Sequence, residues 1–166
     1  DLSKLLIKYP KLQKETIGYS VLGKPIYALK LGNSGKKIVI TAAHHAKEWI
    51  TSALLMCIIN TLLENGNFSH TFYFIPMVNP DGVDLSINGL SDNFPMYIRN
   101  RLLKITHEEN IKDKWQANIR GIDLNHNYDA SFSLGKTLQI KEGIIAPAPT
   151  KYSGEYPESE PETKAI

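Results

Sequence analysis

One short motif combines two side chains that can bind a metal ion. His45-Ala46-Lys47-Glu48 places an imidazole and a carboxylate three residues apart. These are nitrogen and oxygen ligands of catalytic zinc, which usually has three protein ligands and a position left for water. The motif directly follows the apolar run of residues 37–43, which is typical of a strand covered on both faces. The same spacing also occurs on solvated helix faces, so the motif alone leaves both interpretations open.

A second polar group lies between Arg120 and Tyr128. It contains a guanidinium, the carboxylate of Asp123, an imidazole at His126 and the amides of Asn125 and Asn127. Such a segment can bind a ligand, or its Asp and Asn side chains can bond to their own backbone. The residue types by themselves leave these two alternatives open.

Length and composition exclude several classes of protein. The 166 residues suggest one domain, and the net charge of +2 gives no general signal for nucleic-acid binding. One cysteine cannot form an internal disulfide framework, and polar residues interrupt the longest apolar run, residues 50–63. We therefore expect neither a nucleic-acid nor a membrane partner. The chain starts at Asp1 without the pattern of a leader, so any targeting segment lies outside it, and the localisation stays open between the cytoplasm and the outside of the cell.

Hydrophobic periodicity and turn residues indicate the elements that must position these groups. We expect helices over residues 2–9, 48–65 and part of 97–105, a hairpin of residues 16–22 and 25–31, strands over 37–43 and 71–78, a turn at 79–82 and loops over 107–150. Cys57 lies among apolar neighbours in the second helix and is expected to be buried. The alternation predicts an α/β fold, whose ligands gather beyond the carboxyl ends of its strands.

The last residues have the pattern of a helix start. Ser159 is followed three residues later by Glu162, which is the spacing of a capping box, and Pro161 suits a first helical turn. Helices shorter than about 12 residues are marginal without packing. We therefore interpret the end at Ile166 as a truncated element.

Four motifs together resemble the zinc carboxypeptidase family of metallopeptidases, in the family's order and approximate spacing. They are His45–Ile50, Asn79–Gly82, Arg120–Asn127 and Ser159–Thr163. The segments Ile17–Ile26 and Trp115–Gly121 are most similar to the bacterial branch, which includes γ-D-glutamyl-L-diamino acid endopeptidases acting on cell-wall peptides. The resemblance implies an α/β fold with a mixed β-sheet and helices on both faces, of which residues 1–166 are an incomplete, N-terminal portion of one catalytic domain.

The resemblance also implies a role for individual residues. His45 and Glu48 match the first two zinc ligands, and Asp123 matches an acid that orients the histidine ligand. Arg120 matches the arginine that polarises the scissile carbonyl.

The substrate-binding positions depart from the family pattern. Asn125 matches a residue that holds the terminal carboxylate of the substrate, but His126 stands where the family usually has arginine. An imidazole offers one hydrogen bond where a guanidinium offers two. This exchange favours an amidated, branched or γ-linked peptide end over an ordinary α-carboxylate.

The family's third zinc ligand and its catalytic glutamate would follow residue 166. We therefore expect Zn²⁺ in the intact protein, and a weak or empty site and no activity in residues 1–166 alone. The strand that would pair beside residues 37–43 would also be absent, so this strand is expected to be an open edge capable of self-association.

Three functions compete at this stage. The first is zinc-dependent hydrolysis of peptide bonds, of the carboxypeptidase or the cell-wall γ-D-glutamyl endopeptidase type. The second is a non-catalytic module that binds peptides or peptidoglycan, and the third is a zinc deacylase of N-acyl amino acids. The segment Trp115–Asn127 favours the peptidase.

Overall fold

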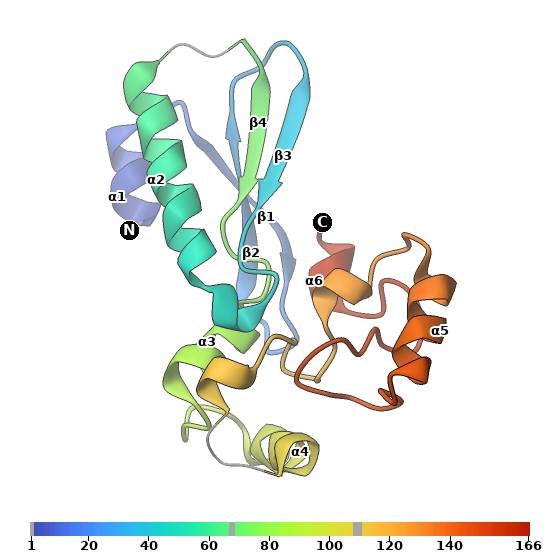
Figure 1. Ribbon diagram of the computed structural model, residues 1–166. Coiled ribbons are helices and arrows are strands. Elements are labelled where there is room, and N and C mark those ends of the chain that lie inside the picture. Colours follow the sequence, from blue (N-terminus) through green and yellow to red (C-terminus); the bar gives the residue numbers. More distant parts are fainter. Residues whose placement is uncertain (1, 67–68, 108–110) are drawn as a thin grey trace.

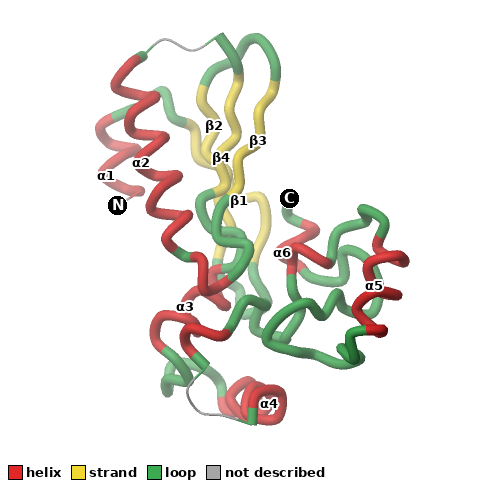
Figure 2. Tube along the Cα trace, viewed as in Figure 1, coloured by secondary structure: helices red, strands yellow, loops and turns green. Residues whose placement is uncertain are grey.

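The fold centres on a mixed four-stranded sheet with the strand order β1-β2-β4-β3 (Figures 1 and 2). The computed structural model describes residues 2–66, 69–107 and 111–166. Its strands are β1 (Gln13–Tyr19), β2 (Pro25–Leu31), β3 (Lys37–Thr41) and β4 (Thr71–Ile75). Strand β2 pairs antiparallel with β1 and β4, whereas β3 pairs parallel with β4.

Helices lie on both faces of this sheet. Helices α1 (Leu2–Lys8) and α2 (Ile50–Asn65) cover one face, and the short α6 (Pro161–Lys164) contacts β1 from the other side (Figure 1). Beyond the end of the sheet lie α3 (Pro80–Asn88), α4 (Met96–Thr106), α5 (Phe132–Lys141) and the 3-10 turns η1 (Ala46–Glu48), η2 (Lys112–Lys114) and η3 (Leu124–His126). The predicted α/β class with a mixed sheet is confirmed.

The alternation of side chains along β2 builds two separate cores, because successive residues of a strand point to opposite faces. Leu29 and Leu31 pack in a cluster with Leu55 and Ile59 of α2. Ile26 and Ala28 belong to the cluster of the opposite face, which also contains Ile75, Val78 and Leu124. The second cluster joins the sheet to the loops that carry the polar motifs.

Most predicted elements are confirmed, including the hairpin turn at Gly23 (φ 81°) and the end of α2 at Gly66 (φ 64°). Two predictions of secondary structure are wrong. The expected turn at residues 79–82 is the start of α3, with Asn79 as its N-cap. Helix α5 lies in a region expected to be loops, since its apolar residues Leu134, Leu138 and Ile140 are exposed and its periodicity is weak.

The predicted capping box at Ser159 is also wrong. Helix α6 has Glu160 at its N-cap, with no hydrogen bond from a capping side chain. The Glu162 carboxylate instead accepts the backbone N–H of Val21 at 3.1 Å, and the Ser159 hydroxyl donates to Glu160 at 3.0 Å. A contact with a distant part of the chain has taken the carboxylate that the local motif would use.

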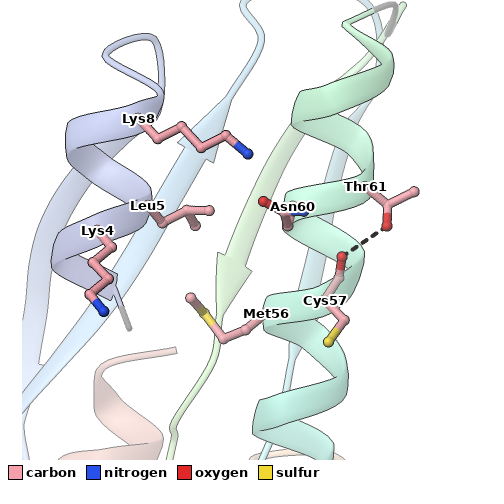
Figure 3. A pocket seen from close by; sticks show the side chains of 7 residues that line it. All are labelled: Lys4, Leu5, Lys8, Met56, Cys57, Asn60 and Thr61. Carbon is pink, nitrogen blue, oxygen red and sulfur yellow. Dashed lines mark hydrogen bonds between the residues drawn. The ribbon is translucent and has the colours of Figure 1, made fainter.

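Cys57 is exposed, which contradicts the expectation of a buried thiol. It lies at a groove of about 540 Å³ between α1 and α2, beside Met56 and opposite Lys4 and Lys8 (Figure 3). Helix α2 buries Leu55 and Ile59, and a residue two positions after Leu55 projects from the other side of the helix.

The segment Ala46–Asn65 is long and apolar enough to cross a membrane by length and composition alone, with a mean hydropathy of 1.3. The polar residues that interrupt the run of residues 50–63 do not prevent this, because η1 and α2 together form one helical segment of 20 residues. Only 17% of the apolar window is buried. Leu55 and Ile59 nevertheless pack against the sheet, as in the core helix of a layered α/β fold.

Strand β3 forms one edge of the sheet and pairs with β4 alone. Ile40 packs toward α2, whereas the Val39 side chain on the opposite face is 59% exposed. The expectation that both faces of this strand are covered is therefore wrong. An exposed apolar edge strand is a template for pairing with another strand.

We expect residues 1–166 to self-associate through β3 at micromolar concentrations. Val39→Lys places a charge on the open strand and should shift the population toward monomer in sedimentation-velocity experiments. Ile145→Lys is a matched control, because Ile145 is 74% exposed and lies outside the sheet. Equal association of both variants and the unmodified chain would contradict the prediction.

Candidate functional site

The carboxyl ends of β3 and β4 lie side by side, and the chain continues from β3 into the His45 motif. Pairing continues past the strands, since Val78 donates its N–H to the Ala42 carbonyl (3.1 Å) and Asn79 to that of Ala43 (3.1 Å). Ala43 has a φ of 53°, a left-handed conformation that turns the chain out of the sheet. Its N–H donates to the Thr51 hydroxyl at 2.9 Å, which fixes this turn against α2.

The fully buried Asn79 amide holds the neighbouring loops together. Its Nδ2 donates to the carbonyls of His44 (3.1 Å) and Ala117 (3.0 Å), and its Oδ1 accepts the N–H of Gly82 (3.0 Å). A Cβ at Gly82 would lie 2.6 Å from the Ala117 carbonyl oxygen, so glycine is required there. The Asn79–Gly82 motif therefore belongs to the scaffold of the site.

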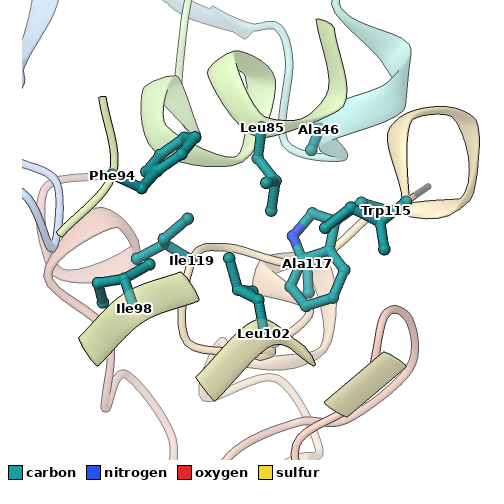
Figure 4. Packing of buried hydrophobic residues seen from close by; sticks show 9 residues of the cluster. Ala46, Leu85, Phe94, Ile98, Leu102, Trp115, Ala117 and Ile119 are labelled. Carbon is teal, nitrogen blue, oxygen red and sulfur yellow. The ribbon is translucent and has the colours of Figure 1, made fainter. Parts of the chain in front are cut away.

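Two hydrogen bonds to the segment at Trp115 fix turn η1. Ala46 donates its N–H to the Gln116 carbonyl (2.9 Å), and Lys47 donates to that of Trp115 (3.0 Å). Ala46 and Trp115 are fully buried in a cluster with residues of α3 and α4, among them Leu85 and Leu102 (Figure 4). These contacts fix the middle of the His45–Glu48 motif, Ala46 and Lys47.

His45 and Glu48 converge as metal ligands would. Nδ1 of His45 lies 3.1 Å from Oε1 of Glu48. Two ligand atoms bound tetrahedrally to zinc at 2.0–2.2 Å are separated by about 3.4 Å, so the pair fits the ion. The side chain of His45 is 20% exposed and that of Glu48 is 48% exposed, which leaves the position open to solvent. Within residues 2–66, 69–107 and 111–166, no group of three or more His, Cys, Asp or Glu side chains could hold a metal ion.

Asp123 lies behind the imidazole. Its Oδ1 is 3.4 Å from Nε2 of His45, and its side chain is 2% exposed. The carboxylate also accepts the backbone N–H of Lys151 (2.8 Å) and of Asn125 (3.2 Å). A carboxylate at Nε2 favours the proton on that nitrogen and leaves the Nδ1 lone pair for a metal.

Asn125 and His126 lie in η3, next to the residue that contacts His45. The Asn125 N–H donates to Asp123 Oδ1, and the His126 N–H donates to the Asp123 carbonyl at 3.0 Å. Both side chains are exposed. They are thus available to a ligand close to the candidate metal position.

Arg120 is placed differently. Its Nη1 lies 3.4 Å from Oε2 of the buried Glu160, and its side chain is 41% exposed. In the part of the chain that the structure describes, no ion pair or hydrogen bond joins Arg120 to His45 or Glu48. The structure therefore brings together His45, Glu48 and Asp123, with Arg120 three residues away along the chain.

Two buried amides to which the sequence interpretation assigned no role organise the surrounding loops. Asn118 accepts the N–H of Arg120 (3.0 Å) and of Ile122 (3.2 Å), and donates to Glu160 at 2.7 Å. Asn127 donates to the Ser153 carbonyl at 2.8 Å and accepts the Glu160 N–H at 3.2 Å. In the sequence, these two amides stand out only by their position inside the polar segments. That position does not distinguish an amide that binds a ligand from one that bonds to the backbone.

Burial dominates the electrostatics around the site. It raises the pKa of Glu162 to about 7, and the nearby Glu160 carboxylate adds to the effect. Burial also lowers the pKa of His44 and raises that of Tyr128 to about 12. His44 Nε2 and the Tyr128 hydroxyl lie 2.8 Å apart, so this imidazole has a partner other than the His45 motif.

The chain is similar to zinc peptidases over its whole length. Residues 1–166 match the zinc carboxypeptidase family. The chain is 36% identical to the γ-D-glutamyl-L-diamino acid endopeptidase 1 of Lysinibacillus sphaericus, covering 100% of this chain and 44% of that protein. It is 30% identical to human mast cell carboxypeptidase A, covering 98% of this chain and 37% of that protein. The chain thus spans less than half the length of these curated relatives.

Solved structures show the same fold. Bovine thrombin-activatable fibrinolysis inhibitor, in complex with tick carboxypeptidase inhibitor, aligns with 99% of this chain and 50% of that chain, with 26% identity and a TM-score of 0.71. The murein-tripeptide amidase MpaA of Escherichia coli O157 aligns with 92% of this chain and 53% of that chain, with 21% identity and a TM-score of 0.51.

Glu162 predicts a pH-dependent stability. Its pKa is raised from 4.5 to about 7 in the folded state, so the folded chain binds this proton more tightly than the unfolded chain does. The contribution is fully present below about pH 4.5 and is lost as the pH rises toward 7, by ~3 kcal/mol at 1.36 kcal/mol per unit. Urea denaturation between pH 4.5 and 8 should show this decline.

Glu162→Gln should flatten the decline, because the amide keeps an acceptor for Val21 without titrating. Glu142→Gln is the control, since Glu142 is an exposed carboxylate that pairs with Lys151. An unchanged slope between pH 5 and 7 in the Glu162 variant would show that this group does not cause the decline.

Proposed function

The chain belongs to the zinc carboxypeptidase family, and on that premise we propose that the complete protein is a zinc-dependent peptidase that cleaves γ-D-glutamyl-L-diamino acid bonds. The observation that carries the proposal is the convergence of His45 Nδ1 and Glu48 Oε1, with the Asp123 carboxylate behind the imidazole. The 36% identity to an endopeptidase of that specificity supports the choice of substrate.

Each residue of the motif has a distinct part in this proposal. His45 and Glu48 would hold a zinc ion, which when bound would supply Lewis acidity toward the amide carbonyl and toward water. Asp123 keeps the His45 ring in one orientation and one tautomer, because its own position is fixed by backbone donors.

Arg120 is proposed to stabilise the negative charge that develops on the carbonyl oxygen. A preorganised donor in this role is typically worth ~3–4 kcal/mol. Its contact with Glu160 restrains the guanidinium, and a 3.4 Å contact is weak enough to be exchanged for a bond to substrate.

The exposed pair Asn125 and His126 supports an endopeptidase rather than a carboxypeptidase. Asn125 is proposed to bind the peptide beyond the cleaved bond, together with His126. An imidazole makes one hydrogen bond and cannot form the bidentate clamp that favours a terminal α-carboxylate. A substrate that continues past this position, or that carries an amidated or branched end, therefore fits better.

The complete protein should cleave a peptide that contains a γ-D-glutamyl-L-lysine bond, as detected by mass spectrometry. A chelator should abolish cleavage, and added zinc should restore it. His45→Ala and Glu48→Ala should lower kcat/KM on the order of a thousandfold, because the ion contributes several kcal/mol. His70→Ala is the control, since His70 precedes β4 and contacts Ser69. Release of C-terminal residues from ordinary peptides, without cleavage of the γ-linked bond, would identify a carboxypeptidase instead.

We further propose that residues 1–166 are the N-terminal portion of the catalytic domain and supply two zinc ligands, with the third ligand and the general base contributed by residues outside this chain. Catalytic zinc sites usually have three protein ligands. Residues 1–166 alone should therefore be inactive and bind zinc weakly in calorimetry, and His45→Ala should remove what binding there is. One zinc ion bound with nanomolar affinity per chain would contradict this assignment.

A further inference from the structure

A cavity of about 220 Å³ is lined by residues that neighbour Asp123 in the sequence, among them Arg120 and Ile122. Arg101 of α4 and Arg120 contribute to its wall, together with Tyr152, Tyr156 and the buried Glu160. No role for this cavity follows from the metal site itself. The lining of the cavity thus includes two guanidinium groups and several side chains that can form hydrogen bonds.

The cavity adjoins the loops that hold Asp123. Ile122 lines the cavity and precedes Asp123, which contacts His45. Tyr152, which also lines the cavity, follows Lys151, whose N–H donates to the Asp123 carboxylate at 2.8 Å. Arg120 lies three residues from Asp123, a span of at most ~10 Å.

The two guanidinium groups differ in how their charges are compensated. Arg120 is paired with Glu160, whose side chain is 2% exposed and also accepts from Asn118 at 2.7 Å. Arg101 donates through Nη2 to the Arg120 carbonyl at 3.3 Å. Across the described ranges of the chain, no carboxylate lies within ion-pair distance of Arg101, although the exposed Glu155 also lines the cavity.

The free charge of Arg101 suits a carboxylate. A guanidinium has five N–H donors in a planar fork and binds a carboxylate through two parallel hydrogen bonds. One bond to a carbonyl orients this fork and leaves donors for a ligand. The Tyr152 and Tyr156 phenols add donors around the same space.

A γ-glutamyl bond places such a carboxylate close to the reaction. This linkage uses the side-chain carboxyl group of glutamate, so the α-carboxylate stays free, three carbon atoms from the scissile carbonyl carbon. Among α-linked peptides, only those with glutamate at this position carry an anion at that distance. We propose that the cavity binds the free α-carboxylate of the γ-D-glutamyl residue through Arg101, a specificity-determining residue. This inference rests on the proposed function.

Two substrates that differ in one group test the proposal in the complete protein. One has a γ-D-glutamyl residue with a free α-carboxylate, and the other has the isosteric α-carboxamide. Wild-type protein should prefer the acid, and Arg101→Gln should lower the ratio of the two kcat/KM values about tenfold through KM. Arg101→Lys should retain part of the preference. Arg99→Gln, on the same helix but paired with Asp92, should leave the ratio unchanged.

The outcomes separate this inference from the proposed function. If wild-type protein cleaves both substrates and Arg101→Gln keeps the ratio, the cavity assignment is wrong and the proposed function stands. If wild-type protein cleaves neither substrate, the proposed function fails. Calorimetry with the same two compounds then decides the cavity assignment, because equal binding of acid and amide by wild-type and Arg101→Gln protein would overturn it.

Discussion

The position of the candidate site depends on one buried carboxylate. The side chain of Asp123 is 2% exposed, and an ionised group in such a place is tolerated only when donors surround it. Those donors are the N–H groups of Lys151 and Asn125, and the His45 ring lies on the same carboxylate. Three segments far apart in the sequence are therefore held against each other. The His45 ring is oriented by the same contacts that fix the loops around it.

Buried amides extend this constraint to the rest of the loop region. Backbone groups removed from water must find partners, and the segment after α4 has little regular structure to provide them. Asn79, Asn118 and Asn127 supply them, since each is fully buried and each both donates and accepts. These three side chains connect the sheet, the loop at Arg120 and the C-terminal residues. Most of the polar side chains in these motifs therefore hold the loops together, and only a few of them face solvent.

Local patterns predicted the strands and helix α2, because hydrophobic periodicity determines these features, whereas the His45–Glu48 spacing alone left a metal site and a solvated helix face both open. The predictions that fail have three different causes. Asn79 caps a helix where a turn was expected, and Val21 takes the Glu162 carboxylate that a capping box would use. Cys57 lies in an apolar segment but on the uncovered side of α2, since a one-dimensional pattern does not state which side of a helix meets the sheet.

On the proposed assignment, two single residues determine which peptide the common scaffold accepts. The scaffold itself aligns with carboxypeptidase structures, with a TM-score of 0.71 over 99% of the chain. At this position His126 would bind a carboxylate beyond the cleaved bond less tightly than an arginine, because an imidazole offers one hydrogen bond where a guanidinium offers two. Arg101 provides a carboxylate-binding group in the cavity beside Arg120. Selectivity for a γ-linked substrate would then arise because the cation that binds the substrate carboxylate is Arg101 and not an arginine at position 126. The zinc ligands and the contacts of Asp123 would stay the same.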